Sequence, residues 1–162
     1  LQHIKRLAGR LAAHLIERLA ARCTVAPDDT DSLDLMKKFV DHYPFIQYLT
    51  LTDAAGHLVQ AVITDPAYKE RYGSLPERGY DYSGREWFKV PMSNGELHIT
   101  DVYQSQYTGK LILSVSKAVT DARDEIVGVL CGDIQLEEIL QRATALEEEE
   151  KDENRAEERE ED

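Results

Sequence analysis

Residues 80–88, Tyr-Asp-Tyr-Ser-Gly-Arg-Glu-Trp-Phe, place four aromatic side chains and one arginine within nine positions. The guanidinium of Arg85 is planar and can donate two parallel hydrogen bonds to a carboxylate. Trp87, the only tryptophan of the chain, adds an indole N–H donor and an apolar wall. These side chains would suit a small molecule with a carboxylate at one end. The alternative is that Trp87 and Phe88 are ordinary core residues and Arg85 is a surface charge.

An anionic counterpart follows at Asp133, at the end of the last β-strand pattern. An α-amino acid needs a cation for its carboxylate and an anion for its ammonium group, and Arg85 and Asp133 carry these two charges. Tyr103 could add an acceptor or a π face for the ammonium. Asp133 also lies just before a helical pattern, where an aspartate is a good N-cap, so a capping role is the alternative.

Motifs of catalysis and metal binding are missing from the sequence. It contains no GxSxG, HExxH, P-loop or GxGxxG pattern, and its five histidines have no metal-ligand spacing. The acidic residues at 28, 29 and 31 lack the glycine and final glutamate of a calcium loop and resemble a helix cap. We therefore expect no enzyme activity, no cofactor and no metal.

Charge is concentrated at the C-terminal end. The chain has a net charge of −12, and residues 147–162 contribute −8 of it through eleven acidic and three basic residues. This run predicts an acidic solvated tail, either a helix end or a disordered segment, although continuation toward a signalling helix is the alternative. No basic cluster that would bind nucleic acid is present. Cys23 and Cys131 could each be free and buried, or could form one bridge in an oxidising compartment.

The elements that must position these residues follow from periodicity. Residues 1–22 predict a long amphipathic N-terminal helix, and a second helix, capped by Thr30 or Ser32, ends at Pro44. Strands are predicted over residues 45–52, 57–64, 97–103, 110–119 and 126–134, with a short helix near 85–90 and a last helix over 136–146. The first two strands form a hairpin around Gly56. The expected fold is α+β, a five-stranded antiparallel sheet flanked by helices.

Residues 45–140 resemble the extracellular Cache domain, also called the PDC domain, a PAS-like sensor of bacterial chemoreceptors, histidine kinases and diguanylate cyclases. The residues that carry the resemblance are Tyr80, Arg85, Trp87 and Phe88 at their spacing, then Tyr103, Thr108 and Gly109, and finally the strand 128–134 that contains Asp133. In the amino-acid-binding branch a tyrosine usually stands at the position of Phe88. The resemblance implies a PAS-like sheet.

The resemblance also implies roles for individual residues. Tyr80, Arg85 and Trp87 would hold the ligand carboxylate, whereas Phe88, Tyr103 and Asp133 would surround the ammonium group. Secondary contacts are expected from four further residues: Tyr82, Asp101, Ser114 and Ser116.

The resulting hypothesis divides the chain into three parts. Residues 1–44 would form the dimerisation and packing helices, residues 45–146 the PAS-like ligand-binding core, and residues 147–162 the acidic tail. The domain would be the periplasmic or extracellular part of a membrane-anchored bacterial receptor, a homodimer through its N-terminal helix, and would bind an α-amino acid. The alternatives are a single-module Cache sensor for a small carboxylate or hydroxy acid, and a ligand-free dimerisation relay.

Overall fold

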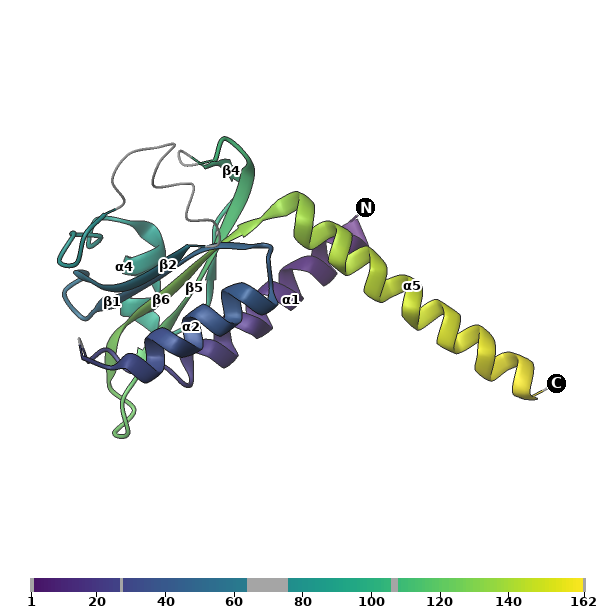
Figure 1. Ribbon diagram of the computed structural model, residues 1–162, viewed down its shortest axis with the longest axis horizontal. Coiled ribbons are helices and arrows are strands. Elements are labelled where there is room, and N and C mark those ends of the chain that lie inside the picture. The colour runs from purple at the N-terminus through teal and green to yellow at the C-terminus, as the bar shows by residue number, and fades with distance from the viewer. Residues whose placement is uncertain (1, 27, 64–75, 106–107, 162) are drawn as a thin grey trace.

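The computed structural model describes residues 2–26, 28–63, 76–105 and 108–161. One antiparallel sheet carries helices on both faces, and a long C-terminal helix extends away from the body of the domain (Figure 1). The predicted α+β, PAS-like architecture is confirmed.

The sheet has five positions across its width. Its order is β2 (Leu58–Ile63), β1 (Ile46–Asp53), β6 (Ile126–Gln135), β5 (Leu111–Thr120) and β3 (His98–Ile99), and the two short strands β3 and β4 (Tyr103–Gln104) both pair with β5 at one edge. The central strands β1, β6 and β5 are almost completely buried. All of the pairings are antiparallel, as the sequence predicted.

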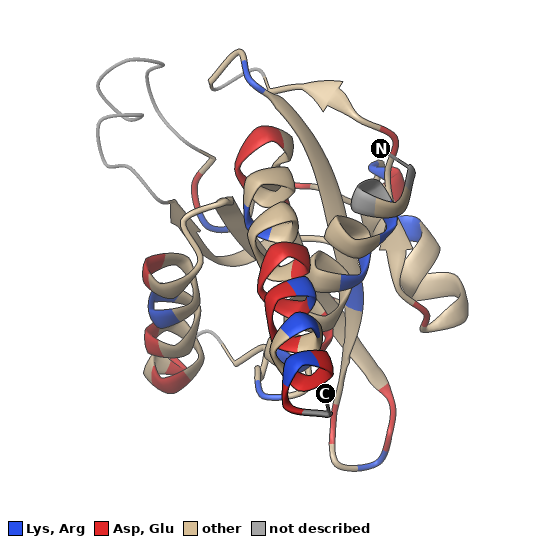
Figure 2. Ribbon diagram, turned by 90° about the vertical axis from the view of Figure 1, so that its right-hand side faces the viewer, with Lys and Arg blue, Asp and Glu red and all other residues tan. Residues whose placement is uncertain are grey.

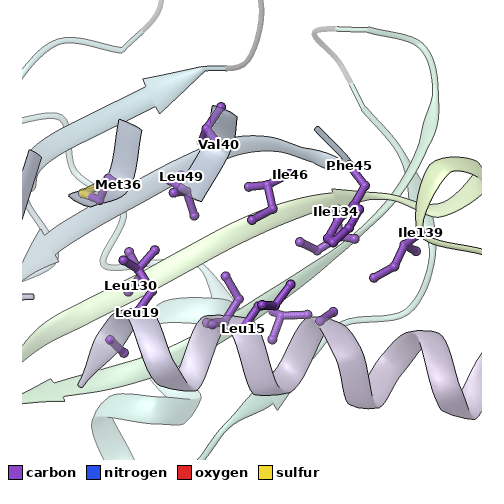
Figure 3. Close-up of a cluster of buried hydrophobic side chains, with 14 of the residues drawn as sticks. Leu15, Leu19, Met36, Val40, Phe45, Ile46, Leu49, Leu130, Ile134 and Ile139 are labelled. Carbon is purple, nitrogen blue, oxygen red and sulfur yellow. The ribbon is translucent and has the colours of Figure 1, made fainter. Parts of the chain in front are cut away.

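Two helices cover one face of the sheet and enclose the main core. Helix α1 (Gln2–Ala20) lies along β5 and β6, and α2 (Thr30–His42) lies along β1 and β2. Figure 3 shows Leu15 and Leu19 of α1 directed toward the sheet beside Leu130 and Ile134. Gly132 allows this close approach, because a Cβ atom there would lie 2.6 Å from Cδ1 of Ile16.

The predicted third strand is divided into β3 and β4 by a bulge. Two hydrogen bonds join Thr100 to Ser114. The Thr100 N–H donates to the Ser114 carbonyl at 2.9 Å, and the Ser114 N–H donates to the side-chain Oγ1 of Thr100 at 2.9 Å rather than to a carbonyl. Tyr103 then pairs with Ile112, so the strand has gained one residue relative to its partner. The single strand expected over 97–103 is therefore replaced by two short strands, β3 and β4, which both pair with β5.

Two helix ends differ from their predicted positions. The N-cap of α2 is Asp29, whose carboxylate accepts the N–H groups of Asp31 and Ser32, rather than Thr30 or Ser32. Helix α4 (Glu86–Asn94) continues through the buried Pro91 and ends at Gly95, which adopts the left-handed conformation that stops helices.

Helix α5 (Leu136–Glu161) includes most of the acidic segment. Residues 148–160 are helical and exposed, and the ribbon in Figure 2 shows acidic residues with a few basic residues among them along this part. The observed form is thus a solvated helix end up to Glu161. No helix within the described residues has the length and apolarity needed to cross a membrane. Cys23 and Cys131 are both free and buried, which excludes the bridge between them in this structure.

Candidate ligand-binding site

Strand alternation gives the sheet a second, polar face. On β1 and β6 the residues Leu49, Leu51 and Leu130 face the helical core, and the intervening residues Thr50 and Cys131 face the opposite side. Helix α4 covers part of this second face beside β5 and β6. The uncovered part opens into a cavity.

The β1–β2 hairpin positions the segment that leads into α4. The Tyr82 N–H donates to the Gly56 carbonyl at 2.8 Å, and the Leu58 N–H donates to the Tyr80 carbonyl at 2.8 Å. Gly56 has a φ of +89°, and a Cβ atom there would lie 2.8 Å from the Ser83 backbone. Only glycine fits at this turn, because a side chain would push the 80–84 segment away from the hairpin.

The cavity lies between this segment, α4 and the polar face of the sheet. It has a volume of about 250 Å³. The lining residues come from β1, β5, β6 and the segments 82–87 and 103–105, and they are Tyr48, Thr50, Tyr82, Arg85, Trp87, Tyr103, Gln104, Ser105, Ile112, Cys131 and Asp133. The site thus combines one cation, one carboxylate and several hydroxyl groups with four aromatic side chains on its walls.

Asp133 ends a chain of hydroxyl hydrogen bonds. Ser114 Oγ donates to Asp133 Oδ1 at 2.7 Å. The Ser114 hydroxyl has only one hydrogen, so the 2.5 Å contact between Ser114 Oγ and the Tyr103 hydroxyl is one in which Tyr103 donates. The three side chains meet because Ser114 lies opposite Asp133 in the β5–β6 register. The Ser114 hydroxyl thus holds Oδ1 of Asp133, whereas Oδ2 accepts no hydrogen bond from the described residues.

Burial has the largest influence on the pKa of the Asp133 carboxyl. It raises the pKa of Asp133 to about 6, against a lowering by the Ser114 hydrogen bond and by the positive charge of Arg85. Burial and then the nearby Asp133 charge raise the pKa of Tyr103 above its usual range. The positive charge of Arg85 lowers the pKa of both groups, by less than burial raises it. At neutral pH the site therefore holds an ionised carboxylate in a poorly solvated position.

Arg85 is the N-cap residue of α4 and remains exposed, with extended backbone angles. Its N–H donates to the Tyr82 carbonyl at 3.0 Å. Trp87, two residues later in the first turn of α4, is half-buried, and its ring centroid lies 5.1 Å from that of Tyr82. Arg85 and Trp87 both line the cavity.

The predicted site residues do not all meet at the cavity. Arg85, Trp87, Tyr103, Asp133 and the secondary candidate Tyr82 line it, and Ser114 touches two of them. The lining does not include the remaining candidates: Tyr80, Phe88, Asp101 and Ser116.

Each of these four has another place in the structure. Phe88 is a buried residue of α4, 6% exposed, whereas Tyr80 is 47% exposed and its ring contacts that of Tyr82. Asp101 is exposed in the bulge between β3 and β4, and Ser116 is buried beside Cys131 in the sheet. The assigned ligand contacts of Tyr80 and Phe88 therefore receive no support from their positions.

Several lining residues were missed by the sequence interpretation. Tyr48 and Thr50 alternate with Leu49 and Leu51 along β1, and this period-2 pattern of polar and apolar residues would have placed them on the cavity face. Cys131 follows the same rule two residues before Asp133. Gln104 and Ser105 gave no such signal, because their positions depend on the bulge.

No three His, Cys, Asp or Glu side chains gather as a metal site in the part of the chain that the structure describes. The cavity itself presents a cation, a carboxylate with its hydroxyl hydrogen bonds, and aromatic walls.

Comparison with solved structures identifies similar domains. The chain is similar to the ligand-binding domain of the amino acid chemoreceptor PctC of Pseudomonas aeruginosa in complex with GABA, with 24% identity and a TM-score of 0.60, over 85% of this chain and 60% of that one. It is also similar to the ligand-binding domain of the chemoreceptor CtaA of Pseudomonas fluorescens in complex with L-alanine, with 26% identity and a TM-score of 0.57, over 84% and 54% of the two chains. This chain thus spans little more than half of these domains.

A relative of different description shares part of its length. A protein described as citrate (Re)-synthase from Syntrophus aciditrophicus is 35% identical over 146 residues, which are 86% of this chain but 22% of that protein. The match covers too little of that protein to carry its activity over. The family model for the Cache domain matches residues 2–155, almost the whole chain. The chain therefore belongs to the Cache domain family.

Proposed function

We propose that this chain is the extracytoplasmic ligand-sensing domain of a bacterial transmembrane receptor, and that it binds a small α-amino acid in the cavity described above. One observation carries the proposal. A single cavity of about 250 Å³ contains Arg85 on one wall and Asp133 on the sheet, so it presents a cation and an anion to one small ligand.

Each of the two charges would bind one end of the ligand. Arg85 would bind the α-carboxylate through its fork of N–H groups, and the Trp87 indole would form the adjoining wall. Asp133 would accept the ammonium through Oδ2, because Ser114 holds Oδ1. The ring and hydroxyl oxygen of Tyr103 lie on the same side as Asp133 and add to the ammonium end.

The chemistry of the cavity favours a zwitterion over a plain carboxylate. A lone carboxylate would satisfy Arg85 but would leave the ionised Asp133 without a cation in a partly buried position, which is costly. The amino acids in the structures of the similar chemoreceptor domains support this choice. The receptor's membrane anchor, its location and its output are parts of the same proposal.

Calorimetric titration with matched ligands tests the proposal. We expect L-alanine to bind, and L-lactate and propionate, which lack the ammonium, to bind at least tenfold more weakly. Arg85→Ala should weaken L-alanine at least tenfold, since a charged hydrogen-bond pair contributes about 1.5–3 kcal/mol. Arg123→Ala, in the exposed β5–β6 turn, is the control with the same charge change.

Two results would contradict the proposal in different ways. Unchanged L-alanine binding by Arg85→Ala would refute the assignment of the carboxylate end. Tighter binding of propionate or lactate than of L-alanine would instead support a carboxylate or hydroxy-acid sensor, and no binding of any of the three would favour a ligand-free relay.

We also propose that the chain pairs with a second copy through its N-terminal helix. Most of the apolar stripe of α1 packs on its own sheet, so the pairing would use the partly exposed Leu7 and Leu11. Sedimentation velocity tests this pairing, and a monomer at all concentrations would contradict it.

A further inference from the structure

A row of polar residues crosses four strands beneath the cavity. In the strand register, Thr50 of β1 pairs with Cys131 of β6, Cys131 pairs with Ser116 of β5, and Ser116 pairs with His98 of β3. The row is the neighbour of the one that holds Asp133 and Ser114, two residues further along the same strands. Thr50 and Cys131 line the cavity directly.

This row is buried without enough hydrogen-bond partners. Ser116 is fully buried, Cys131 is 3% exposed and Thr50 is 4% exposed. Ser116 Oγ and His98 Nε2 are buried side-chain atoms that find no hydrogen-bond partner among the described residues. A buried polar atom left unpaired is destabilising, so a fold that only needed packing here would favour valine or alanine.

The rows define where a bound ligand would direct its side chain. Residues on one face of a strand are about 7 Å apart along it, which is close to the length of a small amino acid. A ligand with its ammonium on Asp133 therefore has the Thr50–Cys131 row within reach of its β and γ atoms. Ile112 supplies an apolar surface at the other end of the cavity lining.

We propose that this polar row recognises a hydroxyl on the ligand side chain, so that the domain selects small hydroxylated amino acids over aliphatic ones of the same shape. The inference rests on the proposed function and names the ligand class for that site. Thr50 Oγ1 would make the direct contact, and Ser116 Oγ would support it through Cys131 or an ordered water. The selection comes from leaving this row unpaired when an aliphatic side chain occupies the cavity.

Pairs of isosteric amino acids test this inference. L-threonine and L-valine have nearly the same shape, as do L-serine and L-2-aminobutyrate, and each pair differs by a hydroxyl replacing a methyl group. In isothermal titration of the wild-type domain we expect the hydroxylated member of each pair to bind at least tenfold more tightly. In Thr50→Val the ratio between the two dissociation constants should fall close to one.

Two further variants keep the test decisive. Thr144→Val makes the same chemical change on the exposed face of α5 and should preserve the wild-type ratio. Ser116→Ala removes an unpaired buried hydroxyl, so it should fold with an unchanged or higher Tm and should still reduce the threonine preference. This variant answers the question if Thr50→Val does not fold.

The outcomes separate the inference from the proposed function. Equal or tighter binding of L-valine than of L-threonine by the wild type would overturn the inference and leave amino-acid binding in place. A threonine preference that survives both Thr50→Val and Ser116→Ala would also overturn it. Failure of all four ligands and of L-alanine to bind would refute the proposed function itself.

Discussion

Replacement of Asp133 by asparagine should stabilise the empty domain while it abolishes amino-acid binding. Burial raises the pKa of Asp133 from its ordinary value of 3.8 to about 6. Each tenfold change in a proton affinity is about 1.4 kcal/mol, so the folded state disfavours the ionised carboxylate by up to about 3 kcal/mol. Asparagine has nearly the same shape and no charge, and the Ser114 hydroxyl can still donate to its carbonyl oxygen.

The pH dependence gives the sign of this effect. Because the folded pKa is raised, the destabilisation is absent below about pH 4, grows as the pH rises and is complete above about pH 6. Urea unfolding of wild type and Asp133→Asn at pH 4, 5, 6 and 7.5 measures the difference. We expect the variant to gain about 1–3 kcal/mol at pH 7.5 relative to wild type, and most of that gain to vanish at pH 4.

A variant that is less stable than wild type at every pH would refute this reasoning, because Asp133 would then be a structural hydrogen-bond partner rather than a strained ligand group. Retained L-alanine affinity in Asp133→Asn would separately refute its role at the ammonium end. Asp121→Asn, in the exposed β5–β6 turn, is a control for the general effect of removing one negative charge.

Three other predictions follow from the same contacts. L-alanine affinity should fall about tenfold per pH unit below pH 6, as protonation removes the negative charge of Asp133; a flat titration profile from pH 7 to 5 would contradict this. Gly132→Ala should destabilise by about 1–3 kcal/mol in urea unfolding, because its Cβ meets Ile16 Cδ1, and pairing it with Ile16→Val should cost less than the two changes added together. Gln47→Leu should destabilise by about 2 kcal/mol, since buried Gln47 donates to Ser105 Oγ at 3.0 Å and accepts from Thr108 Oγ1 at 3.1 Å; an unchanged unfolding midpoint would contradict that.

The layout of the sheet was predictable because its signals are local. The turn at Gly56 and the alternation of leucine with polar residues in the later strands place β1, β2, β5 and β6 within two residues of their observed bounds. The division between β3 and β4 was not predictable in the same way. It depends on the side chain of Thr100 replacing a carbonyl as acceptor, which is a tertiary choice.

The candidate site was predictable in its charges but not in its aromatic residues. Adjacent residues on a helix point about 100° apart, so Trp87 and Phe88 at the start of α4 cannot both face the cavity. Trp87 lines it and Phe88 enters the core. The sequence cluster at 80–88 shows which residues are near one another, whereas the helix start determines which of them reach a ligand.

The cap assignment of Asp133 illustrates a second limit. Its position before α5 fits an N-cap as well as a ligand group, and the sequence left both open. In the structure the carboxylate accepts from Ser114 across the sheet and lines the cavity. That contact depends on the β5–β6 register, which no local pattern around residue 133 reveals.

The most direct test of the central claim is a crystal structure of the domain grown with L-alanine. We predict density for one molecule in the cavity, with its carboxylate on the Arg85 guanidinium and its ammonium within hydrogen-bond distance of Asp133 Oδ2. Density with the ends reversed, or an empty cavity at saturating L-alanine, would contradict the account.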